Sequence, residues 1–435
     1  MKICVQGLWH LGSVTAACLA EVGFTTIGLD DDVRTIDNLK QAVPPLFEPG
    51  LAELVRAGLN AGRLSFTTDA AAAVADADLI WVAFDTPVDD EDRADVAFVR
   101  GRVESLFPHL KDGAAVLVSS QMPVGSVRAL AKGFAAVAGR RRVGFACSPE
   151  NLRLGKAIEV FKNAERIVIG TDDDADGGIA RSRIEPVVAC FCPLLLWVSI
   201  EAAEMVKHAL NAFLATCVTF INEVATVCEQ VGADAAEVEK ALRAEPRVGQ
   251  KCYIRPGAAF AGGTLARDVT FLAELAEQHG LSLPLLGGIL PSNQEHRNWP
   301  LRRLTELLGG VAGRRIAVLG LSYKPGTDAI RRSVAIELAR GLIKAGARVA
   351  AFDPVVQALP DDLAGSVILE FSLEAVLAGV EALVVATEWP EFKSLTADGL
   401  AAIMAPLPLV LDQNRFLGPA IAADPRLRYV TIGKP

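Results

Sequence analysis

The stretch KICVQGLWHLG, residues 2–12, decides the fold of this chain. Its first five residues are mostly apolar and predict a buried strand, and the turn at Gly7 leads into an Ala-rich helical segment. A second β-prone segment, residues 25–29, is followed directly by Asp30. Short strands that alternate with helices predict a doubly wound parallel sheet. Further strands of this sheet are predicted at 79–83, 115–119 and 143–146.

The turn after the first strand has the spacing of a dinucleotide-binding motif with one substitution. Trp9 stands where the middle glycine of GxGxxG lets the backbone approach a pyrophosphate. Asp30 ends the second strand, 18 residues after Gly12, where a carboxylate accepts the ribose 2′-OH and repels a 2′-phosphate. The pattern predicts NAD rather than NADP as the cofactor. A Rossmann-like domain that has lost its dinucleotide, with Trp9 filling the space, is the alternative.

Residues 199–231 contain no Gly or Pro, and their apolar side chains recur every three or four positions. This spacing predicts one continuous amphipathic helix of about 50 Å. A helix of that length favours a connection between domains and a dimer interface. A helix broken by a kink is the alternative.

A second βαβ unit begins at Arg314 with RIAVLGLSYKP. A helix is predicted over 334–345, and the next strand ends on Asp353, with further strands near 382–386 and 409–411. The expected fold class is α/β, with two Rossmann-like doubly wound parallel-sheet domains joined by a long central helix and a helical dimerisation region. The expected domains are an NAD-binding domain (1–198), a central helical domain (199–300) and a second Rossmann-like domain (301–435).

The composition excludes several classes of function. The 435 residues carry a net charge of −9, which argues against a nucleic-acid or anionic-membrane surface. No run of 18 apolar residues predicts a transmembrane helix. Eight scattered cysteines without a CxxC pair indicate reduced thiols in the cytoplasm, and no metal site is expected.

A series of short motifs, taken in order, resembles the UDP-glucose/GDP-mannose dehydrogenase family over nearly the whole chain. After the opening turn these motifs are FEPGL (47–51), GRL (62–64), TTD (67–69), TP (86–87), SPENL (148–152), RIVIG (166–170), AE (203–204) with Lys207, NAFLA (211–215), INE (221–223), RVG (247–249), PG (256–257), RD (267–268), LGLSYKP (319–325), TD (327–328), Arg331 and TEW (387–389).

The resemblance implies an NAD domain, a dimerisation helix and a nucleotide-sugar domain. It also implies oxidation of a sugar CH2OH to a carboxylate with two hydrides per sugar, the second through a cysteine thiohemiacetal and thioester. The expected substrate is a nucleotide-sugar of the UDP-hexose type. A homodimer is expected, with sites completed across subunits.

The expected catalytic residues include two on the long helix. Lys207 and Asn211 are four residues apart and therefore share one helix face, where an ammonium and an amide can stabilise negative charge on O6. By the resemblance, Asp268 works with this lysine as general base through water. Glu150 orients water or the sugar, and Thr264 is the remaining residue assigned to catalysis.

The main departure from the family is that Thr264 stands at the position of its catalytic cysteine. A hydroxyl needs an adjacent base to act as a nucleophile, whereas a thiol is nucleophilic by itself. Cys147 is the nearest alternative thiol by motif position. Three functions therefore stay open: oxidation to the uronic acid through a non-covalent second step, a two-electron dehydrogenase that stops at the 6-aldehyde, and a catalytically silent nucleotide-sugar binding protein.

The resemblance and the turn together assign the remaining contacts. Cofactor contacts are expected from Gly7, Leu8, Trp9, His10, Leu11, Gly12, Asp30, Arg34, Thr86, Ser120, Gln121, Arg267 and Arg331. Substrate contacts are expected from Glu150, Asn151, Leu152, Arg153, Lys207, Asn211, Arg247, Tyr253, Gly257, Phe260, Tyr323 and Lys324. By the resemblance, Arg247 enters the sugar site of the neighbouring subunit.

Overall fold

The computed structural model describes residues 1–87, 94–150, 152–261 and 263–434. These residues divide into two compact units, Met1–Ala209 and Leu210–Pro435. The predicted α/β architecture is confirmed in both, since each contains a sheet with helices on its two faces.

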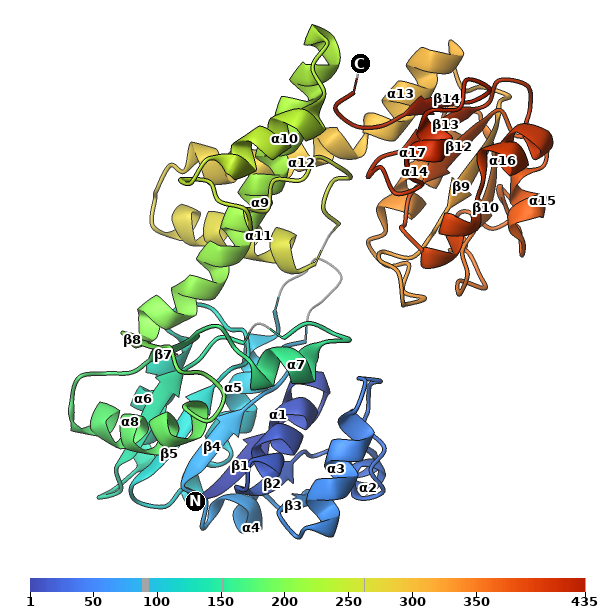
Figure 1. Cartoon of the computed structure of the whole chain (residues 1–435). Helices are drawn as coiled ribbons and strands as arrows, with labels where there is room; N and C mark the ends of the chain where they lie inside the picture. Colours follow the sequence, from blue (N-terminus) through green and yellow to red (C-terminus); the bar gives the residue numbers. More distant parts are fainter. Residues whose placement is uncertain (88–93, 151, 262, 435) are drawn as a thin grey trace. The chain divides into compact units, whose positions relative to one another are not determined.

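The first unit contains an eight-stranded sheet of order β3-β2-β1-β4-β5-β6-β7-β8 (Figure 1). Its strands are β1 (Lys2–Gln6), β2 (Thr25–Leu29), β3 (Leu64–Thr67), β4 (Leu79–Val82), β5 (Ala114–Val118), β6 (Val143–Cys147), β7 (Ile167–Gly170) and β8 (Leu195–Val198). The first six run parallel, as predicted. The pair β6–β7 is antiparallel, so the last two strands depart from the all-parallel sheet that the sequence predicts.

The core of this unit lies on both faces of the sheet. Side chains alternate along β1, with Ile3 and Val5 buried under one set of helices and Cys4 under the other. The first set is α1 (His10–Glu21), α2 (Val33–Lys40), α3 (Leu51–Asn60), α7 (Ala157–Lys162) and α8 (Ala175–Val188). The second set is α4 (Ala70–Val74), α5 (Val96–Glu104), η1 (Phe107–His109) and α6 (Ser126–Val137).

The predicted long helix is α9 (Ile200–Val231), one element of 32 residues that links the two units. It is the one helix of the described residues whose length and composition would allow it to cross a membrane. Its most apolar 18-residue window has a mean hydropathy of 1.4 and is 44% buried against the protein. The core helix of a soluble protein passes the same criteria, so this is weak evidence for a membrane span.

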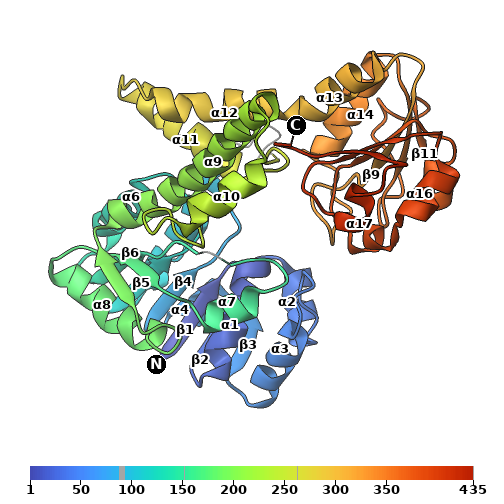
Figure 2. The ribbon, with the colours of Figure 1, turned by 45° about the horizontal axis from the view of Figure 1, so that its top comes forward.

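Four further helices belong to the central part of the second unit. They are α10 (Ala235–Ala244), α11 (Thr264–Gln278), α12 (Pro284–Arg297) and α13 (Trp299–Leu308). Figure 2 shows α11 and α12 side by side next to α9. Ala212 and Ala215 of α9 pack there against Val269 of α11 and Ile289 of α12.

The second sheet has six parallel strands in the order β11-β10-β9-β12-β13-β14. Its elements are β9 (Arg315–Leu319), α14 (Val334–Lys344), β10 (Arg348–Phe352), β11 (Val367–Leu369), α15 (Leu373–Leu377), β12 (Ala382–Val385), η2 (Pro390–Ser394), α16 (Ala397–Ile403), β13 (Leu409–Asp412), α17 (Pro419–Ala422) and β14 (Arg428–Val430). One face packs on α13 and α14, and the other packs on α15, η2, α16 and α17.

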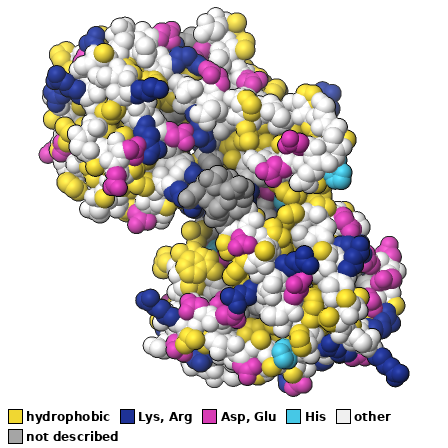
Figure 3. Space-filling model, turned by 180° about the vertical axis from the view of Figure 1, so that it is seen from behind, with side chains coloured by type: hydrophobic (Ala, Val, Ile, Leu, Met, Phe, Trp, Pro, Cys, Tyr) yellow, Lys and Arg dark blue, Asp and Glu magenta, His cyan; other side chains and the backbone are white. Residues whose placement is uncertain are grey.

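The surface carries charges of both signs. On the face that Figure 3 draws, Lys and Arg side chains are interspersed with Asp and Glu. Together with the net charge of −9, this distribution does not favour a nucleic-acid partner. The expectation that there is no such partner stays a prediction.

Candidate active site

The turn between β1 and α1 is shaped by its first glycine. Gly7 has φ +88°, and a Cβ there would lie 2.6 Å from the Phe84 ring. The indole of Trp9 is 50% exposed, so it does not fill the interior of the turn. The first N–H groups of α1 lack partners inside the helix and, with the helix dipole, provide the donors that a pyrophosphate needs. The turn therefore fits a dinucleotide despite the missing second glycine.

Asp30 fixes this turn to the end of β2. The backbone N–H of Leu8 donates to Asp30 Oδ2 at 2.8 Å, and the N–H of Asp32 donates to Oδ1 at 3.0 Å. Arg34 lies exposed in the first turn of α2. The predicted cofactor residues of this segment, Gly7 to Gly12 together with Asp30, thus lie together at the carboxyl edge of the sheet, where doubly wound folds bind ligands.

Glu48 joins this turn to the segment that follows Glu150, a role that the sequence motif alone did not reveal. Its buried carboxylate lies 2.9 Å from His10 Nε2 and accepts the N–H groups of Gly155 at 2.8 Å and Ala157 at 2.9 Å. It thereby caps the amino end of α7. The available signal was the FEPGL motif, which places an acid before a Pro-Gly turn.

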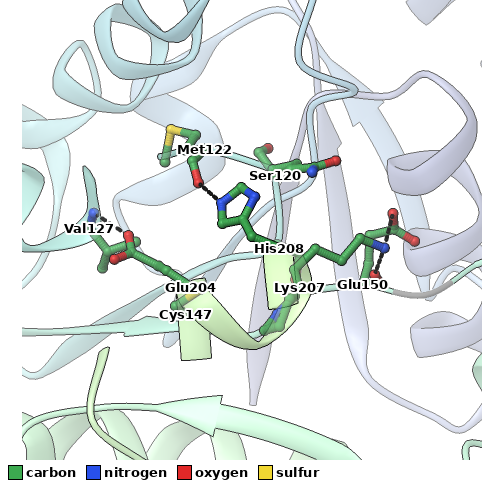
Figure 4. A pocket seen from close by; sticks show the side chains of 11 residues that line it. Ser120, Met122, Val127, Cys147, Glu150, Glu204, Lys207 and His208 are labelled. Atoms are coloured by element: carbon green, nitrogen blue, oxygen red, sulfur yellow. Dashed lines mark hydrogen bonds and ion pairs between the residues drawn. The ribbon is translucent and has the colours of Figure 1, made fainter. Parts of the chain in front are cut away.

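Lys207 points from α9 toward the loop that carries Glu150 (Figure 4). Its Nζ donates to the Glu150 backbone oxygen at 2.7 Å and lies 3.9 Å from Glu150 Oε1. Glu150 Oε2 also accepts the N–H of Leu152 at 2.6 Å. These groups line a pocket of the first unit whose lining residues are Ser119, Ser120, Gln121, Met122, Val127, Cys147, Pro149, Glu150, Glu204, Lys207 and His208.

Two neighbours of Lys207 on α9 hold the opposite wall of this pocket. Glu204 accepts the N–H groups of Gly125 at 2.6 Å and Val127 at 2.9 Å and so caps α6. Burial raises the pKa of the Glu204 carboxyl, and the two donors offset part of that rise. His208 Nε2 lies 3.3 Å from the Met122 oxygen (Figure 4).

The loop that follows β5 is also tied to the segment after β4. Thr86 Oγ1 donates to the backbone oxygen of Gln121 at 2.7 Å. Ser120, Gln121 and Thr86, all expected at the cofactor, are thus brought together in one place.

Cys147 is not suited to replace the missing nucleophile. Its side chain is buried, and burial, followed by the nearby Glu204 carboxylate, raises the pKa of the Cys147 thiol above its usual value. Because the thiolate is the reactive species, this residue stays unreactive.

Asn211 and Asp268 form a buried pair in the second unit. Asn211 Nδ2 donates to Asp268 Oδ2, and the Asp268 side chain is fully buried. Asp268 lies one turn after Thr264, which is exposed and begins α11. Arg267 lies beside it on the same helix. A carboxylate in this environment is held in place by the amide rather than by solvent.

A second cavity, of about 320 Å³, contains three of the predicted substrate residues, Tyr253, Gly257 and Phe260. Its remaining lining residues are Val218, Arg255, Pro256, Ala258, Leu265, Glu388 and Asn414. Asn414 Oδ1 accepts the N–H of Ala258 at 2.8 Å, and Arg255 Nη2 donates to the Asn414 oxygen at 2.7 Å. Burial raises the pKa of the Glu388 carboxyl, which Arg255 partly opposes. Neither Arg255 nor Glu388 was predicted as a contact.

The turn of the second sheet repeats the device of the first. Gly320 has φ +85°, and Leu321 N–H donates to Asp353 Oδ2 at 2.7 Å, as Leu8 does to Asp30. Burial alone would raise the pKa of Asp353, but its backbone N–H donors lower it below the usual value. In the loop that follows, Tyr323 is 40% exposed and Lys324 Nζ lies 5.4 Å from its ring centroid.

Three predicted residues line neither of these pockets, and a fourth lies outside the described structure. Arg247 is exposed and pairs with Glu245 at 2.8 Å, and it is not among the residues that line the two pockets described above. Arg331 precedes α14 in the second unit, and Arg153 is exposed after the Glu150 loop. Asn151 lies outside the described residues. In the described part of the chain, no group of three or more His, Cys, Asp or Glu side chains could hold a metal ion.

A mostly parallel α/β sheet with a glycine turn, a helix amino end and an aspartate that follows the second strand is the arrangement of an NAD-binding domain. Comparison with known proteins shows the family of dehydrogenases to which the chain is similar. The UDP-glucose/GDP-mannose dehydrogenase family matches by its NAD binding domain at residues 1–187, its central domain at 201–295 and its UDP binding domain at 317–419. The chain belongs to this family.

Individual relatives agree with the family match along the whole chain. A UDP-glucose 6-dehydrogenase of Rhizobium meliloti is 34% identical, with 100% of both chains covered. UDP-glucose 6-dehydrogenase TuaD of Bacillus subtilis is 32% identical over 100% of this chain and 93% of its own. The structure of a UDP-glucose dehydrogenase from Pyrobaculum islandicum matches with a TM-score of 0.84 at 30% identity, covering 100% of this chain and 98% of that one. The protein is an NAD-dependent nucleotide-sugar 6-dehydrogenase, which confirms the predicted family, fold class and cofactor.

Proposed function

We propose that this protein oxidises the C6 hydroxymethyl group of a UDP-hexose, with UDP-glucose as the first candidate, to the uronic acid in the cytoplasm. The relatives named above are UDP-glucose 6-dehydrogenases, and the matching C-terminal domain is described as UDP binding. The observation that carries the proposal is the Asn211–Asp268 pair, a fully buried carboxylate held by an amide. A protein that only bound its ligand would have no chemical need for such a base.

The proposed roles follow from the charges of these groups. When bound, NAD would supply the hydride acceptor, with one NAD molecule needed for each of the two oxidations. The Lys207 ammonium stabilises negative charge on O6, and Asn211 fixes the Asp268 carboxylate. Asp268 takes the hydroxyl proton through a water molecule. Loss of one hydride and one proton converts the alcohol into the aldehyde.

The second oxidation is proposed to proceed without a covalent intermediate. Thr264 is an exposed hydroxyl at the start of α11, and Cys147 is a buried thiol with a raised pKa. Water adds to the aldehyde instead, and the resulting hydrate loses a second hydride and a proton to give the carboxylic acid. The same observation on Thr264 favours a second candidate, an enzyme that stops at the 6-aldehyde.

One assay separates these functions. The purified protein is incubated with NAD and a panel of UDP-, GDP- and dTDP-hexoses with their N-acetyl forms, while NADH is followed by absorbance and the sugar by mass. Two NADH per sugar and a carboxylate product support the proposal. One NADH and an aldehyde support the second candidate. Absence of NADH with every sugar, together with a nucleotide-sugar-dependent rise in Tm, would show a silent binding protein and contradict both.

The Thr264→Cys variant is expected to form a covalent sugar adduct that the wild-type protein does not form. A thiol at the amino end of α11 gains thiolate character from the helix dipole, so it can attack the aldehyde. The measurement is the mass of the denatured protein after brief mixing with NAD and UDP-glucose. Thr264→Ala is the matched control and should keep turnover within about threefold of wild type. Loss of turnover in Thr264→Ala would instead make the hydroxyl a participant in catalysis.

We further propose that the protein is a homodimer that pairs through α9. Phe213, Phe220 and Val227 lie seven residues apart along α9 and are 58%, 50% and 60% exposed. This spacing puts them on one face of the helix. An exposed apolar stripe of this kind marks a protein interface, and the second subunit would supply the exposed Arg247.

The Phe220→Glu variant is therefore expected to shift the protein from dimer to monomer, because a carboxylate would be buried without a partner at the interface. Sedimentation measures the change in mass. Turnover should fall with it by about tenfold or more, since Arg247 of the neighbouring chain is lost from each site. Val137→Glu on α6, also at an exposed apolar position, is the control and should stay dimeric. A Phe220→Glu protein that remained a dimer would exclude this face.

A further inference from the structure

The loop of residues 254–261 lines part of the cavity of about 320 Å³ and contains no helix or strand. Within the described part of the chain, its backbone makes no hydrogen bond to the backbone of another segment. Gly257 of this loop is nevertheless buried. Buried N–H and C=O groups need partners, so in this loop the partners have to come from side chains.

Two side chains from different helices hold the backbone of Gly257. Its N–H donates to Asn222 Oδ1 of α9 at 3.0 Å, and its oxygen accepts a hydrogen bond from His296 Nε2 of α12 at 2.9 Å. A carbonyl oxygen only accepts, so the Nε2 atom carries a proton. Asn222 and His296 are 2% and 8% exposed. Burial lowers the pKa of His296, partly opposed by the bond to Gly257, and a neutral imidazole with its proton on Nε2 meets this geometry.

A third side chain, Asn293, forms two hydrogen bonds with the backbone of Phe260. Its Oδ1 accepts the Phe260 N–H at 3.0 Å, and its Nδ2 donates to the Phe260 oxygen at 2.9 Å. A neighbouring strand forms the same pair of bonds with one residue of a sheet. Asn293 is buried and lies three residues before His296 on α12, so both side chains project from one face of the helix. Ile289 of the same helix packs against α9 and α11 and thereby fixes α12 beside the loop.

We propose that Asn222, Asn293 and His296 are positioning residues that hold the 254–261 loop in its substrate-binding shape before the nucleotide-sugar arrives. A loop that is already ordered loses little conformational entropy on binding, so more of the contact energy appears as affinity. The three side chains act through the backbone of the loop and do not react. The inference rests on the proposed function, in which this loop contacts the nucleotide-sugar.

The His296→Leu variant is expected to raise the Kd of UDP-glucose by about tenfold or more, because the loss of one buried hydrogen bond frees the loop. Calorimetric titration of the full-length protein measures this change. The Kd of NAD should stay unchanged, since the cofactor turn belongs to the first unit. The kinetic loss should appear in KM, with kcat at saturating sugar within about threefold of wild type, because Asn211 holds the Asp268 carboxylate without His296.

Two further variants separate positioning from a general loss of stability. His296→Gln should restore most of the affinity, since the glutamine amide N–H can donate to the same Gly257 oxygen. Ser292→Ala is the matched control on α12. It removes the bond from Ser292 Oγ to Glu223 Oε1 of α9 at 2.5 Å, which does not involve the loop, and it should bind UDP-glucose as the wild type does. Unchanged affinity in a folded His296→Leu protein, or an equal loss in Ser292→Ala, would overturn the proposal.

The wild-type protein provides a test that needs neither a variant nor a sugar. In the ligand-free protein the backbone amides of Gly257 and Phe260 should exchange slowly with deuterium, as measured by mass spectrometry, because both are held before substrate binds. Fast exchange that slowed only on addition of UDP-glucose would contradict the proposal. A wild-type protein that did not bind UDP-glucose would refute the proposed substrate, whereas the exchange result would still decide the role of the three side chains.

Discussion

Replacing Lys207 by Ala is expected to reduce turnover by about 10²- to 10³-fold, the usual cost of removing one group that stabilises a developing oxyanion. The Lys207 side chain is 13% exposed, and its Nζ is 2.7 Å from the Glu150 backbone oxygen. An ammonium that is largely withdrawn from water and fixed by a carbonyl is pre-organised for an anion. The loss should appear mainly in kcat, since negative charge on O6 develops only during the reaction.

The control for Lys207→Ala is Lys132→Ala, which removes an exposed lysine of α6 in the same unit. This variant should retain wild-type kinetics. Tm of both proteins shows whether the fold is kept, because Lys207 also contacts the Glu150 loop. Undiminished turnover in a folded Lys207→Ala protein would remove Lys207 from the proposed mechanism.

The elements that the sequence predicted best are those whose pattern is local. The predicted bounds of β1 and β2 agree with the structure residue for residue, and α9 begins one residue after its predicted start. In both strands the sequence signal is a short run of β-prone residues next to a turn. In α9 it is an uninterrupted period of three to four residues over its 32 positions. Such signals need no knowledge of distant contacts.

Elements at the sheet edge were harder to predict. β7 and β8 have only four residues each, and most side chains of β8 are half-buried or exposed, so neither shows a clear run or alternation. The direction of β7 against β6 depends on a single pairing, between Cys147 and Gly170.

Helix α12 was also hard to predict from the sequence. It contains Gly287, Gly288 and Pro291, which disfavour a helix, and it forms because Ile289 packs against α9 and α11.

In the candidate site, too, features with a local sequence pattern could be predicted, whereas those that depend on distant contacts could not. The motifs predicted which residues to examine, and Thr264 at the start of α11 could be recognised from the sequence alone. The sequence did not reveal that Glu48 accepts hydrogen bonds from two backbone N–H groups more than 100 positions away, those of Gly155 and Ala157. Both interactions join a side chain to backbone groups of another segment. Backbone donors are present at every position, so no residue pattern marks them.

The glycine turns that follow β1 and β9 are stabilised by the same hydrogen-bond pattern. In each, a glycine with positive φ follows the first strand, and the next N–H group donates to an aspartate that ends the second strand. The two aspartates differ in their surroundings, because Asp353 is buried and also accepts the Trp389 indole N–H at 3.0 Å. Asp353 is thus committed to the fold, whereas the less buried Asp30 keeps the capacity for a ribose hydroxyl.

The Gly320→Ala variant is consequently expected to destabilise the second unit by about 3 kcal/mol or more. The left-handed backbone conformation costs a non-glycine residue on the order of 1–3 kcal/mol, and overpacking adds about 1–3 kcal/mol. Gly320 has φ +85°, and a Cβ there would lie 2.4 Å from Thr387 Cβ and 2.8 Å from the Thr387 backbone. The backbone cannot yield as the end of a flexible side chain would. Denaturant unfolding followed by circular dichroism measures the loss.

Gly365→Ala separates the two causes of this loss. Gly365 has φ +81°, almost the same as Gly320, but no atom lies within 4 Å of its Cβ position. It should therefore show the conformational cost alone, about 1–2 kcal/mol. The difference between the two variants then measures the cost of the overlap between the added Cβ at position 320 and Thr387, the residue that lies against the glycine turn just after β12. Equal destabilisation by both variants would mean that this contact adds nothing, and that positive φ alone keeps glycine at position 320.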